Sequence, residues 1–416
     1  SGDDCDDCAA VPYGDSYLDD CGTCDNIFGN DCAQYTIELD GVDLISFYAL
    51  PEDNSVENIF SDIQDYNLGI LGEGISASYW NGMWLGALLA IEPEDGYWVT
   101  HSNSSSTAEL NVIGIPTDPN TVYDLHIHTN LISYPFPEFA LIEETIPEAA
   151  QGSIDAIITE GTAAMNTNEG WVGGLRGLEG TKGYWFITNE YFSFTYNPPA
   201  ATSARKASPI RSVPMEYKFN QSTQQAFYFV NSASIGGESL DMRDLIIAYN
   251  DDVIVGSRYW YGDVTDVPAM GADDSEIYAG YCTTGDRVSF KVWDDSEQKM
   301  INMVADTEVS WNNLSVSVIN LTEQIIPKTI SLGEAYPNPF NPTTNVELFM
   351  PVDGFVSVKI YNIMGQMVAT LHEGNLIARE TSYSFTWDAA DEASGIYFVK
   401  AETDGFIQKQ KLMLVK

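Results

Sequence analysis

The sequence predicts a mainly β chain, built from several β-sandwich or β-rich modules in tandem. Three observations support this prediction. Short runs of β-branched and aromatic residues recur along the 416 residues, turns rich in Gly, Asn and Asp separate them, and residues 39–99 are repeated further on. Half-buried strands and the turns between them select these residue types. A chain of this length holds roughly two to four domains, each able to bury its own core.

The charge of the chain restricts its partners. The 61 Asp and Glu outnumber the 18 Lys and Arg, the net charge is −43, and the first basic residue is Arg176. Such a surface repels phosphate backbones and anionic headgroups, which excludes nucleic acid as a partner. No apolar run reaches the roughly 18 residues that a membrane span needs. The remaining partners are cations such as calcium, neutral polymers such as surface glycans, and other copies of the chain.

The first predicted segment, residues 1–34, combines aspartates with most of the cysteines. It contains five of the six cysteines: Cys5, Cys8, Cys21, Cys24 and Cys32. Two C-x-x-C pairs are compatible with a zinc site, but interleaved carboxylates favour calcium. We expect disulfides and calcium here, and a merely solvated acidic segment is the third alternative. The candidate calcium ligands are Asp15, Asp19, Asp20, Asp25 and Asp31. The segment resembles the Asp/Cys-rich calcium-binding repeats of the thrombospondin type 3 kind.

An internal repeat occupies the next part of the chain. Residues 39–99 align without a gap on residues 126–186, so that residue n matches residue n + 87. Trp84-Leu85-Gly86 matches Trp171-Val172-Gly173, and Gly96-Tyr97-Trp98 matches Gly183-Tyr184-Trp185. This agreement indicates a duplicated module. We place the two copies at residues 35–125 and 126–196.

Each copy reads as short strands with at most one short helix. In the first, Ser55 precedes apolar residues at helical spacing and is expected to cap a helix; Pro147–Ala150 begins the weaker counterpart. The tryptophans have two interpretations. Exposed in a row they would stack on sugar rings, and buried they would belong to the core. The core interpretation is favoured, with Trp84, Trp98, Trp171 and Trp185 in corresponding buried positions.

One short stretch suggests a metal site at the start of the second copy. Asp124, His126 and His128 alternate along the sequence and would share one face of a strand. A transition-metal site needs at least three convergent ligands. The alternative is a polar outer face of a strand, which the absence of histidines in the other copy favours.

Residues 197–214 are rich in Pro, Ser and Ala and are predicted to form a linker. Residues 215–325 again alternate strands and turns, which predicts a β-sandwich domain. Within it, the acidic stretch Asp263–Glu276 is interpreted as a solvated loop, with a calcium site as the alternative.

The last predicted domain, residues 326–416, has the most specific motifs. Tyr336-Pro337-Asn338-Pro339-Phe340-Asn341-Pro342 precedes alternating strands that include Tyr361-Asn362-Ile363-Met364-Gly365-Gln366, Gly395-Ile396-Tyr397-Phe398 and a basic last strand ending at Lys416. The pattern predicts a compact antiparallel sandwich. From about residue 331 onward it resembles the C-terminal sorting domain of type IX secretion cargo. The resemblance implies an immunoglobulin-like sandwich, contact with the type IX export machinery, and a location at the outer cell surface or outside the cell.

The sequence contains no G-x-S-x-G, H-E-x-x-H, Walker or G-x-G-x-x-G motif, and its four histidines leave few members for a nucleophilic triad. A glycosidase-type pair among the 61 carboxylates stays an alternative, because only geometry would select it. We therefore expect a secreted, non-catalytic structural protein of the cell surface that associates with copies of itself, for instance in a filament or surface layer. The alternative is an adhesin or glycan-binding surface protein, which the nine tryptophans would suit.

Overall fold

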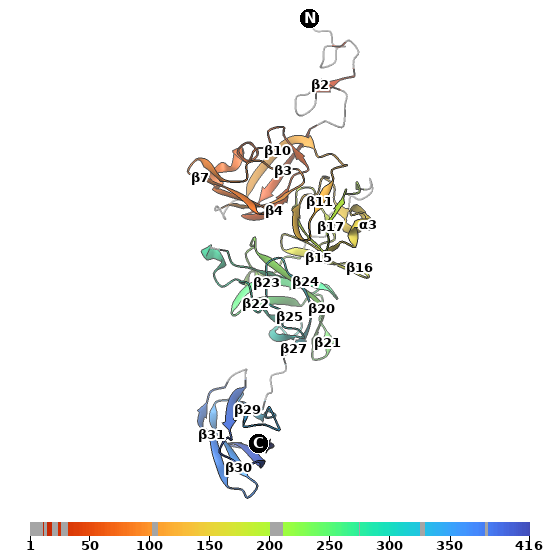
Figure 1. Ribbon diagram of the computed structural model, residues 1–416. Helices are drawn as coiled ribbons and strands as arrows, with labels where there is room; N and C mark the ends of the chain where they lie inside the picture. The colour runs from red at the N-terminus through yellow and green to blue at the C-terminus, as the bar shows by residue number, and fades with distance from the viewer. Residues whose placement is uncertain are drawn as a thin grey trace. The chain divides into compact units, whose positions relative to one another are not determined.

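The structure is a computed structural model that describes residues 11, 15–18, 24–25, 32–101, 107–199, 211–273, 275–324, 329–378 and 382–416. It divides into two compact units, Ser1–Glu323 and Gln324–Lys416. Strands make up 54% of the structure and helices 7%, which confirms the mainly β class (Figure 1). Upstream of the first repeat, β1 (Tyr17–Leu18) pairs with β2 (Cys24–Asp25).

The first repeat packs a five-stranded sheet, ordered β4-β9-β6-β7-β8, against a three-stranded sheet, ordered β3-β10-β5. The strands are β3 (Ala33–Leu39), β4 (Val42–Ser46), β5 (Ala49–Leu50), β6 (Leu68–Gly72), β7 (Ile75–Trp80), β8 (Met83–Gly86), β9 (Gly96–His101) and β10 (Ala108–Pro116). The helical pieces are α1 (Val56–Ile59) and η1 (Ser61–Tyr66). As predicted, the Ser55 hydroxyl caps α1 by accepting from the N–H of Asn58 at 3.3 Å.

The second repeat has a five-stranded sheet of the same connectivity, ordered β12-β18-β14-β15-β16. Its strands are β11 (Tyr123–Leu125), β12 (His128–Ile132), β13 (Ala140–Leu141), β14 (Ile154–Thr159), β15 (Thr162–Thr167), β16 (Gly170–Gly173), β17 (Gly177–Leu178), β18 (Tyr184–Thr188) and β19 (Phe192–Phe194). Two single helical turns, α2 (Ile142–Thr145) and α3 (Glu148–Gln151), occupy the expected helical region. Since β11 pairs with β19, the second module begins before residue 126.

The strand register follows the sequence repeat. Tyr79 pairs with Trp84 in the first copy, and Asn166 pairs with Trp171 at the matching positions of the second. Backbone conformation explains why both copies have a glycine at the end of the W-x-G motif. Gly86 has φ 135°, and a Cβ there would lie 2.2 Å from the carbonyl oxygen of Ser76; Gly173 is placed in the same way. The two copies are therefore equivalent modules, as predicted.

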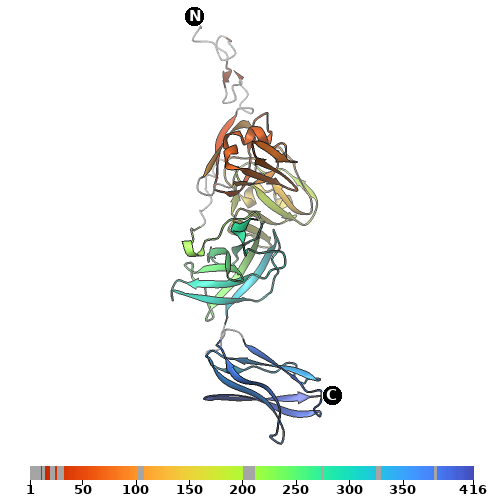
Figure 2. The ribbon, with the colours of Figure 1, turned by 90° about the vertical axis from the view of Figure 1, so that its left-hand side faces the viewer.

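The two repeats lie side by side (Figures 1 and 2) and contact each other through equivalent residues. Ile45 of the first repeat forms a β-bridge with Lys182 of the second. Their equivalents, Ile132 of the second repeat and Asp95 of the first, form the reciprocal β-bridge. Leu44 and Trp98 pack against their own counterparts in the other copy, Leu131 and Trp185. The second motif, Gly-Tyr-Trp, thus has a clear division of roles. Its tyrosines enter the two module cores, its tryptophans lie between the modules, and its glycines let the other copy approach.

The third module, residues 211–323, surrounds its core with one eight-stranded sheet, so the layers expected of a sandwich come from a single curled sheet. Its elements are η2 (Met215–Tyr217), β20 (Gln225–Ile235), β21 (Glu238–Ser239), β22 (Leu245–Asn250), β23 (Val253–Tyr259), β24 (Thr265–Met270), η3 (Glu276–Tyr278), β25 (Ser289–Asp294), β26 (Lys299–Ala305) and β27 (Val316–Glu323). Strand β20 pairs in parallel with β27 and antiparallel with β24. Cys282 is buried in this core, and burial raises the pKa of its thiol to about 12, so it is a packing residue.

The second unit is a two-layer sandwich. Its three-stranded sheet has the order β28-β29-β32 and its four-stranded sheet the order β31-β30-β33-β34. The strands are β28 (Ser331–Leu332), β29 (Thr343–Phe349), β30 (Gly354–Asn362), β31 (Met367–Leu376), β32 (Tyr383–Asp388), β33 (Gly395–Thr403) and β34 (Phe406–Leu414). Alternate residues such as Val358, Val399 and Leu412 fill the core, as the sequence pattern predicted.

Candidate interaction surfaces

The predicted calcium segment is only partly described. Asp25 lies in β2 opposite Tyr17 of β1, and Asp15 precedes β1. Asp19, Asp20 and Asp31 lie outside the described residues. Within the part of the chain that the structure describes, no group of three or more His, Cys, Asp or Glu is placed to hold a metal ion. The calcium site therefore stays a prediction. Cys32 is disulfide-bonded, and the other predicted disulfides stay predictions.

The predicted row of Asp124, His126 and His128 does not form one strand face. Strand β11 ends at Leu125 and β12 begins at His128, so His126 lies in the connection. The His126 Nε2 is 2.8 Å from the Glu73 Oε1 of the first repeat. The backbone carbonyl of Ile127, and then Glu73, raise the pKa of His126. The role of this histidine is to join the repeats.

Two carboxylates beside the inter-repeat contact have unusual acidity. Asp43 is 5% exposed, and burial, reinforced by the negative charge of Glu160, raises its pKa to about 6. Lys182 and backbone N–H groups of Asp40 and Gly41 partly offset this rise. Burial also raises the pKa of Asp95 to about 6, although its side chain retains more contact with solvent. The contact between the repeats therefore favours the protonated form of both groups.

The acidic stretch Asp263–Glu276 is not a loop throughout, because β24 occupies residues 265–270. Asp266 is fully buried in this strand and binds the second repeat. Its Oδ2 accepts from the Thr162 hydroxyl at 2.8 Å and from the Ala163 N–H at 2.9 Å. The buried Arg258 lies 3.4 Å from the same carboxylate and donates to the carbonyl of Gly161. The sequence did not reveal this contact between modules, because Thr162 and Asp266 lie 104 positions apart along the chain.

Around this ion pair, the third module covers part of one face of the second repeat: Ile158 and Ala163 are buried, Thr167 and Val172 are half-buried, and Gly170 is exposed. We call this face the second-repeat outer face; it consists of Ile158, Ala163, Met165, Thr167, Gly170 and Val172. Ile158 and Ala163 are 0% exposed and pack against Phe227 and Phe229 of β20. Tyr228 and Val230, which alternate with these phenylalanines along β20, point to the other side and enter the core of the third module. The contact is therefore sheet face against sheet face.

The matching face of the first repeat is open. This first-repeat outer face consists of the residues at n − 87: Leu71, Ser76, Ser78, Trp80, Met83 and Leu85. Its apolar side chains are 37% (Leu71), 60% (Trp80), 60% (Met83) and 53% (Leu85) exposed. At its far edge it carries larger apolar residues than the covered face does, since Trp80, Met83 and Leu85 stand where the second repeat has Thr167, Gly170 and Val172. An apolar sheet face of this kind marks an interaction site.

The four tryptophans of the repeat motifs do not form an exposed row. Trp98 is buried, while Trp84, Trp171 and Trp185 are half-buried, so the positions correspond as predicted but only one is fully buried. Trp84 and Trp171 pack against the cores of their own modules. All nine tryptophans are among the described residues, and of these only Trp80 is largely exposed.

The second unit presents a basic and apolar sheet face. Between the core residues of β30, β33 and β34, alternate side chains point outward. Ser357, Glu402 and Ile407 lie at one end of this face, and the rest of it consists of Tyr361, Lys359, Ile396, Phe398, Lys400, Lys409, Lys411 and Met413. We call this set the lysine face. Lys400 pairs across the sheet with Lys359 on one side and Lys409 on the other. Like charges placed opposite each other destabilise a sheet, and the ion pairs of Lys359 with Glu373 and of Lys400 with Glu402 offset this in part.

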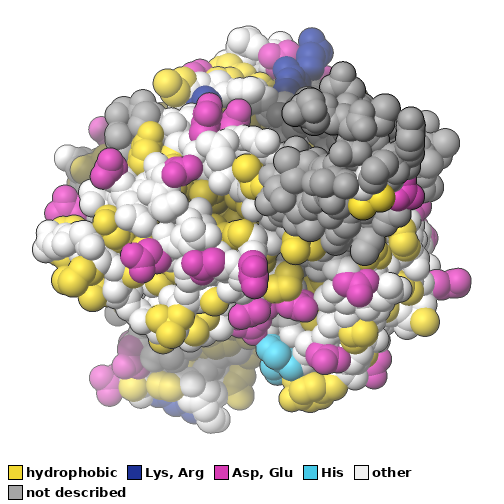
Figure 3. Space-filling view, turned by 90° about the horizontal axis from the view of Figure 1, so that it is seen from above, with side chains coloured by type: hydrophobic (Ala, Val, Ile, Leu, Met, Phe, Trp, Pro, Cys, Tyr) yellow, Lys and Arg dark blue, Asp and Glu magenta, His cyan; other side chains and the backbone are white. Residues whose placement is uncertain are grey.

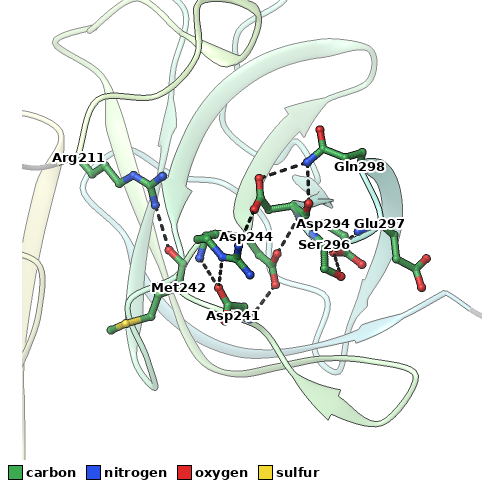
Figure 4. Close-up of polar contacts among 10 residues, drawn as sticks. Arg211, Asp241, Met242, Asp244, Asp294, Ser296, Glu297 and Gln298 are labelled. Carbon is green, nitrogen blue, oxygen red and sulfur yellow. Dashed lines mark hydrogen bonds and ion pairs between the residues drawn. The ribbon is translucent and has the colours of Figure 1, made fainter.

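Elsewhere, acidic side chains are spread over the surface, as the face seen in Figure 3 shows. The densest polar cluster of the third module has a structural explanation (Figure 4). The buried Asp244 accepts from the backbone N–H groups of Asp241 at 2.7 Å and Asp295 at 3.0 Å. Arg243 contacts the carboxylates of the same two residues. These contacts hold two turns together and leave Asp244 satisfied.

Comparison with known proteins identifies the domain at the C-terminal end of the chain. Residues 334–416 match the family of the secretion system C-terminal sorting domain. The chain therefore carries the sorting domain of type IX secretion cargo, which marks proteins that the export machinery delivers to the cell surface or the extracellular space. None of the helices in the described residues is long and apolar enough to span a membrane.

The remaining comparisons do not identify a closer relative. The search of curated proteins finds no match. Among solved structures, the chain is similar to dimeric latent PorU from Porphyromonas gingivalis, with 12% identity and a TM-score of 0.18 over 92% of this chain and 30% of that chain. It is also similar to domains 1–6 of the surface layer protein SbsC, with 8% identity and a TM-score of 0.18 over 93% of this chain and 53% of that chain. The chain thus spans well under two thirds of either structure, and such scores do not establish a common fold.

Proposed function

We propose that this chain is a non-catalytic structural protein of the cell surface that associates with copies of itself after export. The observation that carries the proposal is the open first-repeat outer face. In the second repeat, Ile158 and Ala163 of the counterpart face are buried by another module of the same chain, whereas Leu71, Trp80, Met83 and Leu85 of this face are 37% to 60% exposed. Exposed apolar faces of this kind belong to protein interfaces.

Two further features support this function. The buried Arg258–Asp266 pair and the buried Asp244 are engaged in joining modules and turns, which is a structural use of charged groups. The sorting domain delivers the chain to the outside of the cell, where high salt or calcium would screen the repulsion between subunits that each carry −43.

Analytical ultracentrifugation of the purified 416-residue chain tests this function, together with negative-stain microscopy. We expect concentration-dependent assemblies in sea-water salt with millimolar calcium, and fewer of them without screening ions. A monomer at every concentration and in every salt would contradict the proposal. In that event, a glycan array would test the adhesin alternative, for which Trp80 is the exposed aromatic residue.

A further inference from the structure

The strand that covers the second-repeat outer face has a local sequence that occurs again in the second unit. In β20 the residues are Phe227-Tyr228-Phe229-Val230, and in β33 they are Ile396-Tyr397-Phe398-Val399. In both strands the tyrosine and the valine are buried in their own core. In both, the first and third residues point away from that core.

These outward residues differ in what they contact. Phe227 and Phe229 are fully buried against Ile158 and Ala163 of the second repeat. Ile396 and Phe398 of the lysine face are 37% and 38% exposed. The second unit therefore presents a surface of the type that the second repeat already binds, and the first repeat presents the matching unoccupied face.

The first-repeat outer face has no charged side chain of its own, but it belongs to an acidic module, whereas the lysine face is basic. The first module, residues 35–125, contains 15 Asp and Glu and no Lys or Arg. The lysine face carries four lysines, of which Lys359 contacts Glu373 and Lys400 contacts Glu402. Lys409 and Lys411 are exposed and form no salt bridge with any residue that the structure describes. Attraction between such surfaces guides association, and apolar contact supplies most of the stability.

We propose that the lysine face of one molecule docks on the first-repeat outer face of a second copy. Phe398 and Ile396 then cover Leu71, Trp80 and Leu85, in the manner in which Phe229 and Phe227 cover Ile158 and Ala163. The two surfaces are different, so the contact is heterologous, and its repetition from copy to copy builds an open filament. This inference rests on the proposed function and names the surfaces through which it acts.

Two double variants of the full chain remove one surface each. Trp80→Ser with Leu85→Ser removes the apolar part of the first-repeat outer face, and Lys409→Glu with Lys411→Glu reverses charge on the lysine face. All four side chains are exposed, so each variant should keep the melting temperature of the wild type. The matched controls are Met242→Ser and Arg287→Glu, which change exposed apolar and basic residues of the third module.

Sedimentation velocity of each variant and of their mixture gives the result. We expect each double variant alone to be monomeric, with association weakened at least tenfold, and the controls to assemble as the wild type does. An equimolar mixture of the two double variants keeps one intact surface of each kind. It should therefore form pairs of one molecule of each, which grow no further.

Other outcomes would overturn the inference. Loss of assembly in the Trp80/Leu85 variant alone would mean that the first-repeat outer face packs on its own copy. Unchanged assembly in both variants would place the contact elsewhere and leave the proposed function standing. If the wild type is itself monomeric throughout, it is the proposed function that fails, and glycan binding lost in the Trp80/Leu85 variant would then assign this face to a polysaccharide.

Discussion

Replacement of Asp43 by Asn should stabilise the protein at neutral pH. Asp43 is buried at the contact between the repeats, and its pKa is raised from 3.8 to about 6, first by burial and then by Glu160. A shift of this size corresponds to about 3 kcal/mol in favour of the protonated form. Asn130 occupies the equivalent position of the second repeat and is also buried, so the variant introduces a side chain that this environment already accommodates.

The sign of the pH dependence follows from proton linkage. The folded state holds more protons than the unfolded state between the two pKa values, so stability falls as the pH rises from about 4 to about 6. The penalty is complete above that window and absent below it. Asp43→Asn should therefore raise the free energy of unfolding by about 2 to 3 kcal/mol near pH 7.5, and by about half as much near pH 5.

Urea unfolding followed by tryptophan fluorescence at the two pH values measures this effect. Glu52→Gln, which removes an exposed charge, is the control and should change stability little at either pH. The reverse variant, Asn130→Asp, should destabilise the protein near pH 7.5 more than near pH 5. A loss of stability in Asp43→Asn near pH 7.5, or a gain independent of pH, would refute the assignment of a buried charge that its partners compensate only in part.

Two further predictions concern the first unit. Arg258→Met leaves the Asp266 carboxylate buried without its cation and should lower the free energy of unfolding in urea by about 3 to 5 kcal/mol. The double variant Arg258→Met with Asp266→Leu should recover part of this loss. An unchanged unfolding midpoint in the single variant would show that the ion pair does not join the modules. In the N-terminal segment, chelation of calcium should lower the melting temperature, and mass mapping should find disulfides among Cys5, Cys8, Cys21, Cys24 and Cys32. Five free thiols would contradict the disulfide half of this prediction, and a melting temperature unaffected by chelator would contradict the calcium half.

Local features of the fold were predictable because they depend on neighbours in the sequence. The cap at Ser55 needs only the N–H of Asn58 three residues later. Alternation in β30 and β33 predicted which residues fill the core of the second unit. The predictions at His126 and Asp266 were wrong because strand boundaries and burial there depend on distant residues. Glu73 binds His126, and the second repeat covers Asp266.

The sequence by itself determined the β class, the duplication and the sorting domain. The β class follows from residue periodicity, the duplication from a constant offset between the copies, and the sorting domain from a continuous motif. Only the tertiary structure decided which faces are covered. The repeat motifs are the same in both copies, yet Ile158 is buried and Leu71 is open, because the third module follows the second repeat and packs on it alone. Burial of a sheet face depends on what lies opposite it in space, and that information is distributed over residues about 100 positions apart.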